Sequence, residues 1–276
     1  LAEHRFRMVT GAGALASDLG WLQGIAHRLQ LDVELVDESD RLSVIGIWGP
    51  HARAVMTAAT TADLSNEAFP FGTGQDIVVG SAPAFAQRIT YVGEFGYELY
   101  VDPTWTVAVW DRLMAAGAEH GIRVCGYRAL DGLRMEKGYR HWSHDISPDD
   151  TPIEAGLGFT VAYDKPGGFI GRDALLKQKE TGVKKRLVQF ALNDAGKLLY
   201  HNEPVLRDGK IVSHISSGAY GHHLGGAMGM SYIPCAGESA ADVLGSTYEV
   251  DVMGTRVRAE VSLKPMYDPS AERTKA

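Results

Sequence analysis

Two glutamates flanking a glycine-rich turn are the residues best placed to do chemistry. Glu94 and Glu98 lie in residues 91–98, which also hold two glycines and two tyrosines. Glycine lets a ligand approach the backbone closely, and tyrosine offers a flat face to a ring. A carboxylate can accept two hydrogen bonds from a ring N–H and a neighbouring exocyclic amine, as a pterin would donate. An ordinary hairpin with an exposed glutamate would give the same pattern, so the residue types alone leave both interpretations open.

Other chemical signals are weaker. His141 and His144 lie three apart in a segment predicted as a loop, whereas two histidines at this spacing need a helix to converge on a metal. His222 and His223 are adjacent, so on a strand they would point to opposite faces. Residues 10–13 follow a predicted strand but lack the third glycine of a dinucleotide fingerprint. We therefore expect neither a metal nor a dinucleotide site.

The first half of the chain alternates predicted strands with predicted helices, which is typical of an α/β or α+β region. An aspartate followed by proline marks the start of one helix near residue 102. The expected strands are 5–9, 33–36, 43–48, 87–91 and 96–101, and the expected helices are 17–30, 51–59, 103–118 and 127–136.

Beyond about residue 184 the pattern changes to many short strands separated by turn residues. Asp208 and Gly209 form a dipeptide typical of a tight hairpin turn. Regularly spaced short strands predict a small β-barrel or sandwich. The expected strands are 185–192, 204–206, 211–215, 227–233, 248–253 and 255–262, and the polar residues 177–184 mark the boundary.

Composition excludes several classes of function. The 276 residues carry a net charge of −7 with scattered lysines and arginines, unlike a nucleic-acid surface. No apolar run has the length of a membrane helix. The two cysteines, Cys125 and Cys235, form no disulfide framework and fit reduced thiols, so we expect a cytoplasmic protein, or one of the mitochondrial matrix in a eukaryote. The chain opens at Leu1, which fits a processed product or a piece of a longer protein.

Several segments resemble, in order, the motifs of the glycine-cleavage T-protein (aminomethyltransferase) family. Residues 91–98 resemble its Tyr-Thr-Gly-Glu-x-Gly-x-Glu motif, and residues 129–138 resemble its Ala-Arg-Asp-x-Leu-Arg-Leu-Glu-Ala-Gly helix. Segments 144–157, 169–172 and 216–234 continue the match over essentially the whole chain. Residues 63–73, 136–140 and 266–269 look most like the folate domain of dimethylglycine and sarcosine dehydrogenases.

The resemblance implies an α+β fold, the family's three-lobed cloverleaf, with tetrahydrofolate bound between the lobes. Residues 1–39 with 141–180 would form one lobe, 40–140 a ferredoxin-like lobe, and 185–270 a carboxyl-terminal β-barrel. FAD is expected only if a separate or upstream flavin domain exists.

Glu98 matches the family's pterin-binding glutamate. The resemblance also places Tyr91, Glu94 and Tyr267 in the folate pocket. Where the family has an arginine before the helix aspartate this chain has Leu130, so Arg128 is the candidate replacement, and Thr10 takes the place of a family asparagine.

A Gly-Gly-Ile-x-x-Asp-like motif, whose aspartate assists transfer in the family, has no match in this sequence. We therefore expect the amino-terminal part of the family domain to be absent, and the catalytic residue stays unassigned.

The function that this resemblance implies is a one-carbon-transfer module. Tetrahydrofolate would capture the carbon that an enzyme removes from a small N-methylated amine of the dimethylglycine or sarcosine type, forming 5,10-methylenetetrahydrofolate. The partners would be folate, the amine and a flavoprotein domain or subunit, with no nucleic acid and no membrane. The alternatives are a stand-alone aminomethyltransferase acting on a lipoyl carrier, a folate-binding protein without transfer activity, and demethylation of a sulfonium or aryl ether.

Overall fold

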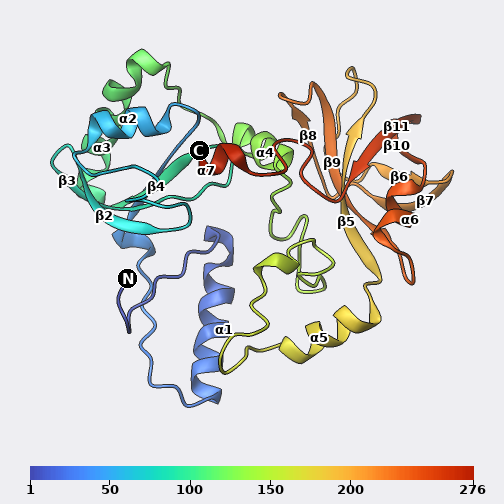
Figure 1. The fold of residues 1–276 in the computed structure, drawn as a ribbon, viewed down its shortest axis with the longest axis horizontal. Helices are drawn as coiled ribbons and strands as arrows, with labels where there is room; N and C mark the ends of the chain where they lie inside the picture. The colour runs from blue at the N-terminus through green and yellow to red at the C-terminus, as the bar shows by residue number, and fades with distance from the viewer.

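A computed structural model describes the whole chain, Leu1–Ala276, and Figure 1 shows two antiparallel sheets on either side of α4. α1 and α5 lie apart from both sheets, and α7, at the carboxyl end, lies beside α4. The boundaries of the three lobes stay a proposal. No helix in the structure is both long and apolar enough to cross a bilayer.

The first sheet has the strand order β1-β4-β3-β2, and all its neighbouring strands are antiparallel. Its strands are β1 (Ser43–Trp48), β2 (Gly74–Val79), β3 (Ala82–Gln87) and β4 (Gly96–Val101). α2 (Ala52–Ala59) and α3 (Thr106–Gly117) contribute to the core on one face of this sheet. Because successive residues of a strand point to opposite faces of the sheet, every second side chain points away from that core.

α3 begins where the sequence predicts. The Asp102 side chain accepts a hydrogen bond from the backbone N–H of Thr104 at 2.9 Å, and a 3₁₀ turn over Pro103–Trp105 leads into the helix. Val109 and Leu113, four residues apart, are buried against the sheet. α4 (Tyr127–Glu136) also has the predicted bounds.

The second sheet has seven strands in the order β7-β6-β10-β11-β5-β9-β8 and curls around its own core. The strands are β5 (Lys185–Leu192), β6 (Pro204–Arg207), β7 (Lys210–His214), β8 (Ser217–Gly221), β9 (Gly226–Pro234), β10 (Tyr248–Val252) and β11 (Thr255–Ser262). Asp208 and Gly209 both have positive φ, at 51° and 78°, which the tight β6–β7 turn requires. The sequence predicts six of these strands and misses β8.

The remaining elements connect or cover the sheets. They are α1 (Leu15–Arg28), α5 (Arg172–Thr181), α6 (Ala240–Gly245) and α7 (Glu272–Lys275), with 3₁₀ turns at Ala12–Ala14, Ser39–Arg41, Ala118–His120 and Gly158–Thr160. Neither α1 nor α5 contains a buried residue. Ser239 and Asp242 form a capping box at the start of α6.

Three predicted strands are wrong. Residues 5–9 and 33–36 have strand-like sequences, but they pair with no strand, and a strand needs a ladder partner. The strand predicted at 87–91 lies earlier, at β3. The residues of β3 that face the core are small alanines rather than large apolar residues, so the sequence of β3 lacks the pattern typical of a buried strand. The backbone after Gln87 instead enters a turn, in which the Thr90 hydroxyl accepts hydrogen bonds from the N–H groups of Val92 and Gly93.

Candidate functional site

β4 presents two different faces of the first sheet. Tyr97 and Leu99 point into the core shared with α2 and α3, and neither is exposed to solvent. Glu98 and Tyr100 therefore lie on the opposite face, away from both helices. The Tyr100 hydroxyl donates to Glu98 Oε2 at 2.7 Å, which fixes the direction of the carboxylate. Burial is the main cause that raises the pKa of Tyr100, and the hydrogen bond to Glu98 raises this pKa further, so the hydroxyl stays protonated.

The neighbouring strand β3 adds two side chains to the face of Glu98. Gln87 pairs with Glu98 and Phe85 pairs with Tyr100 in the antiparallel register. Directly opposite residues project to the same side of a sheet. The face thus combines a carboxylate, an amide and the partly exposed ring of Phe85, which can hydrogen-bond and stack against a heteroaromatic ligand, whereas the Tyr100 ring is only 4% exposed.

Arg7 lies over this aromatic face. Its guanidinium carbon is 5.4 Å from the ring centroid of Phe85 and 5.7 Å from that of Tyr100. The guanidinium also forms an ion pair with Glu38 at 3.2 Å, yet its Nη1 is buried without a hydrogen-bond partner. An open pocket of about 400 Å³ lies beside Arg7, Phe85 and Gln87. Its volume is that of a pocket for a small organic ligand.

A second group of side chains gathers near the carboxyl end of the chain. The Tyr267 hydroxyl donates to Glu94 Oε1 at 3.2 Å, and Arg273 approaches the same carboxylate at 3.3 Å. The Tyr267 ring stacks on His223 with centroids 4.1 Å apart. Burial and the neighbouring Glu94 carboxylate raise the pKa of Tyr267.

The other predicted site residues lie elsewhere. The Tyr91 hydroxyl donates to the backbone oxygen of Arg140 at 2.9 Å, and burial raises the pKa of Tyr91. Thr10 is exposed and hydrogen-bonds Asp18 of α1. Arg128 is exposed in the first turn of α4. The structure therefore unites Glu94 with Tyr267, but it brings neither Thr10 nor Arg128 into hydrogen-bond contact with the other candidates.

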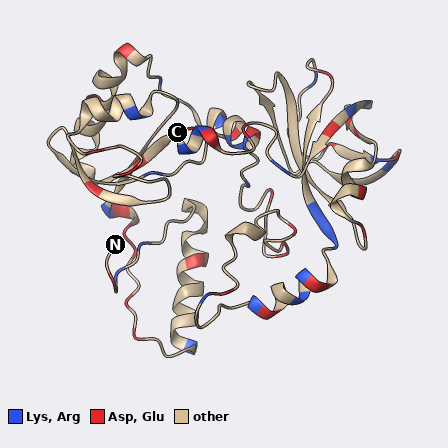
Figure 2. Cartoon of the chain, in the orientation of Figure 1, with Lys and Arg blue, Asp and Glu red and all other residues tan.

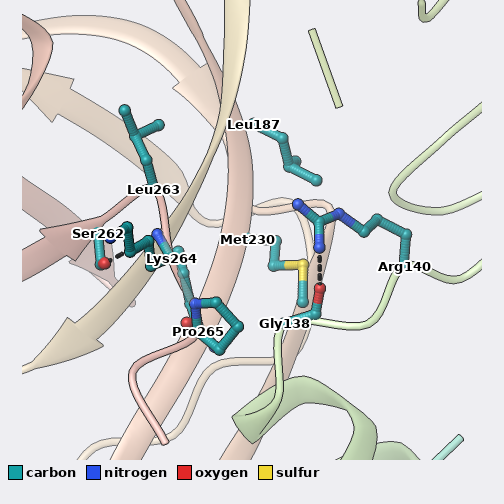
Figure 3. A pocket seen from close by; sticks show the side chains of 9 residues that line it. Gly138, Arg140, Leu187, Met230, Ser262, Leu263, Lys264 and Pro265 are labelled. Carbon is teal, nitrogen blue, oxygen red and sulfur yellow. Dashed lines mark hydrogen bonds between the residues drawn. The ribbon is translucent and has the colours of Figure 1, made fainter. Parts of the chain in front are cut away.

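A small cavity between the loop after α4 and the curled sheet is too tight for a cofactor. Figure 3 shows the Arg140 side chain turned back to hydrogen-bond the Gly138 carbonyl, with Met230 and Pro265 closing the space. The cavity measures about 20 Å³, which holds roughly one water.

Charge is mixed over the whole molecule. Figure 2 shows Lys and Arg spread over both sheets and the helices, with Asp and Glu among them.

The histidine pair of the sequence does not lie in a cluster of metal ligands. The stacked His141 and His144 rings have centroids 4.6 Å apart, and no group of three or more His, Cys, Asp or Glu could hold a metal ion.

Reasoning from the sequence missed Arg7, Phe85 and Gln87. Placing a strand at 87–91 hid the pairing of Phe85 and Gln87 with β4. Arg7 lies in a stretch of alternating polar and apolar residues, and nothing else in the sequence marks it. Its contact with Phe85 joins segments that are far apart in the sequence.

Two family models match the chain. The GCVT N-terminal domain matches residues 1–165, and the glycine cleavage T-protein C-terminal barrel domain matches residues 185–268. The first match begins at residue 1, so the expectation that the amino-terminal part of the family domain is absent is not supported.

Curated relatives are of two kinds. The chain is 40% identical over 269 residues to a 4-methylaminobutanoate oxidase (formaldehyde-forming) of Paenarthrobacter nicotinovorans, covering 98% of this chain and 32% of that protein. It is 40% identical over 245 residues to human mitochondrial sarcosine dehydrogenase, covering 88% of this chain and 27% of that protein. An aminomethyltransferase of Symbiobacterium thermophilum is 33% identical, with 97% of this chain and 70% of that protein covered. The chain thus spans about a third of the length of the first two relatives.

The fold is also known from experiment. The crystal structure of the glycine cleavage system aminomethyltransferase T from Bartonella henselae matches with a TM-score of 0.76, at 24% identity, over 94% of this chain and 68% of that one. This likeness shows that the two chains share one fold, including the curled carboxyl-terminal sheet. With both family domains matched in order along its length, the chain belongs to the glycine cleavage T-protein family.

Proposed function

We propose that this chain is the tetrahydrofolate-dependent module of an enzyme that demethylates a small N-methylated amine, with 5,10-methylenetetrahydrofolate as its product. The observation that carries the proposal is its 40% identity, over nearly its whole length, to an oxidase and a dehydrogenase whose names specify N-methylated amines. Family membership supports the folate-dependent chemistry.

The face of β4 that bears Glu98 fits a folate. The carboxylate is half-buried and faces away from the core, so its oxygens can accept from the ring N–H and exocyclic amine of a pterin. The partly exposed ring of Phe85 can stack on a ring of the ligand, and the amide of Gln87 can hydrogen-bond a polar group; both line the open pocket together with Arg7. We therefore assign Glu98 as the pterin anchor and Arg7, Phe85 and Gln87 as its neighbours.

Tetrahydrofolate supplies the nitrogens that take up the one-carbon unit. The residues of this chain bind and orient it, so that the reacting nitrogen is held close to the incoming carbon. Tyr100 keeps the Glu98 carboxylate in one direction. We propose that a flavoprotein domain or subunit oxidises the amine and that FAD belongs to that partner. Cytoplasm, or the matrix of a mitochondrion, is the proposed compartment, in keeping with the two free cysteines.

A second candidate is a stand-alone aminomethyltransferase. The chain covers 70% of such a relative, against 32% and 27% of the oxidase and the dehydrogenase. The two functions differ in the one-carbon donor. Transfer to tetrahydrofolate from an aminomethylated lipoyl carrier, but not from formaldehyde, would favour the second candidate.

Calorimetric titration with tetrahydrofolate tests the proposal. We expect the chain to bind tetrahydrofolate and Glu98→Ala to weaken binding by roughly thirty-fold or more, because losing a charge-assisted bidentate contact costs about 2–4 kcal/mol. Glu249→Ala is the matched control, since Glu249 is also a half-buried glutamate in mid-strand, but on β10 of the other sheet. Equal affinity of wild type and Glu98→Ala would contradict the assignment of Glu98. Absence of binding by the wild type would contradict the proposed function.

A further inference from the structure

Trp48, the last residue of β1, lies on the same sheet face as Glu98. In the antiparallel register of β1 and β4, Trp48 pairs with Gly96. Gly46, two residues before Trp48, pairs with Glu98. The residues on either side of Gly46 point into the core shared with α2 and α3, so Gly46 and Trp48 belong to the opposite face.

The indole of Trp48 spreads over two glycines instead of standing up from the sheet. Its pyrrole side reaches sideways, where Nε1 donates to the backbone oxygen of Ile89 at 3.0 Å and a Cβ on Gly96 would lie 2.5 Å from Cδ1. Its benzene side reaches back along β1, where a Cβ on Gly46 would overlap Cη2 and Cζ3. Both directions lie in the plane of the sheet. The half-buried indole therefore lies flat on the strands, with its other face turned outward.

The benzene edge of this indole lies beside the Glu98 side chain. Directly opposite residues of an antiparallel pair have Cβ atoms about 4.5–5.5 Å apart, and the indole occupies the place of the missing Gly46 side chain. Tyr100 also contacts the Glu98 carboxylate, but it is buried. The Phe85 ring leans the other way, over Gly74 of β2. The indole thus provides the accessible aromatic face next to Glu98.

We propose that Trp48 is the platform on which the pterin of tetrahydrofolate stacks while Glu98 holds the edge of the pterin. This inference rests on the proposed function and adds a specificity-determining residue to it. An indole has two fused rings and matches the area of a two-ring heterocycle. A carboxylate at the rim of the indole can accept from the N–H and amine at the edge of a ligand that lies on it. The two residues together select a flat ring with neighbouring donors on one edge.

The same arrangement sets the direction of the bound ligand. β4 lies between β1 and β3, so Gly46 and the indole flank Glu98 on one side and Gln87 flanks it on the other. The open pocket of about 400 Å³ lies on the Gln87 side, with Phe85 in its wall. With the pterin on the indole, the aminobenzoyl-glutamate part of the folate extends toward this pocket, where Phe85 can stack on its ring.

Fluorine NMR of the chain labelled with 5-fluorotryptophan tests this contact without measuring activity. The five tryptophans give one resonance each, and Trp48→Phe identifies that of Trp48. We expect saturating tetrahydrofolate to shift the Trp48 resonance. A tetrahydropterin that lacks the tail should shift it in the same direction, and aminobenzoyl-glutamate alone should not. Trp110 is the matched control, because it is 41% exposed on α3, which covers the other face of the sheet.

Calorimetric titration with tetrahydrofolate provides the second test. We expect Trp48→Leu to weaken binding by roughly ten-fold or more, because the stacking contact with an aromatic side chain is lost. Trp48→Phe should weaken binding less, since a flat ring remains. Trp110→Leu should bind as the wild type does.

Gly46→Ala tests the position of the ring. A methyl group at Gly46 must push the indole aside, because the atoms that it meets are ring atoms of Trp48. We expect Gly46→Ala to weaken tetrahydrofolate binding in the wild type and to have little further effect in Trp48→Leu. Losses that add in full would overturn the placement of the pterin on the indole.

The outcomes separate this inference from the proposed function. A wild type that binds tetrahydrofolate with no shift of the Trp48 resonance would overturn the role of Trp48 and leave the proposed function standing. A Trp48 resonance that responds to aminobenzoyl-glutamate and not to the tetrahydropterin would do the same. A wild type that does not bind would overturn both. Because the fluorine spectra of the wild type decide the matter, the test holds even if Trp48→Leu fails to fold.

Discussion

The guanidinium of Arg134 lies 2.5 Å from the carboxylate of Asp145, and only 2% and 0% of these side chains are exposed. Arg134 also donates to the Ser217 hydroxyl at 3.1 Å, and Asp145 accepts from Ser216 at 2.7 Å. The pair therefore ties α4 and the loop after it to the start of β8.

Removing one partner of this buried pair should strongly destabilise the protein. We expect Asp145→Ala to lower the free energy of unfolding by about 3–5 kcal/mol, because an uncompensated buried arginine remains. Asp131→Ala is the control, since Asp131 also contacts Arg134, at 2.7 Å, but is 51% exposed, and it should cost about 1 kcal/mol or less. Urea denaturation measures both. Similar losses in the two variants would contradict this assignment.

Gly93 is required by a close contact as well as by its backbone. It has φ of +76°, and a Cβ there would lie 1.7 Å from Cγ of Lys137. Gly209 has φ of +78° and no atom within 4 Å of such a Cβ. Gly209→Ala should cost about 1–2 kcal/mol for the left-handed backbone alone. Gly93→Ala should cost roughly 1–3 kcal/mol more from the clash, as thermal and urea unfolding would show.

Asp268 should make stability depend on pH in the acid range. Burial acts to raise its pKa, but hydrogen bonds from Lys137 and from the N–H groups of Glu272 and Arg273 outweigh burial and hold the pKa below its usual value. A lowered folded-state pKa stabilises the protein above the unfolded-state pKa of about 3.9, and this stabilisation disappears as pH falls through the folded-state pKa. In urea denaturation at several pH values, the deficit of Asp268→Asn should be largest near neutrality and shrink below about pH 4. A constant deficit would rule this out.

Tyr100 should tune folate binding through Glu98. Tyr100→Phe keeps the ring beside Phe85 and removes only the hydroxyl that donates to Glu98. We expect tetrahydrofolate affinity to fall by about three- to ten-fold, corresponding to one hydrogen bond of about 1 kcal/mol, and thus by less than in Glu98→Ala. Calorimetry measures the change. A larger loss than in Glu98→Ala would mean that the hydroxyl itself, and not the carboxylate, holds the ligand.

The sequence by itself determined the elements whose signals are local. The Asp102 cap places the start of α3, the four-residue apolar spacing gives its buried face, and the Asp208–Gly209 turn joins β6 to β7. The motif at residues 91–98 singled out Glu94 and Glu98 for the same reason, since residue type and spacing lie within one short segment.

Only the tertiary structure decided which side chains share a site. Glu94 and Tyr267 are 173 residues apart in sequence, and Trp48 and Ile89 are 41 apart. Strand register likewise placed Phe85 and Gln87 beside Tyr100 and Glu98, where the strand predicted from sequence began too late. Such contacts depend on which segments pack together when the cores of both sheets form. The periodic spacing of apolar residues in a sequence predicts that one face of an element is buried, but it does not predict which other element covers that face.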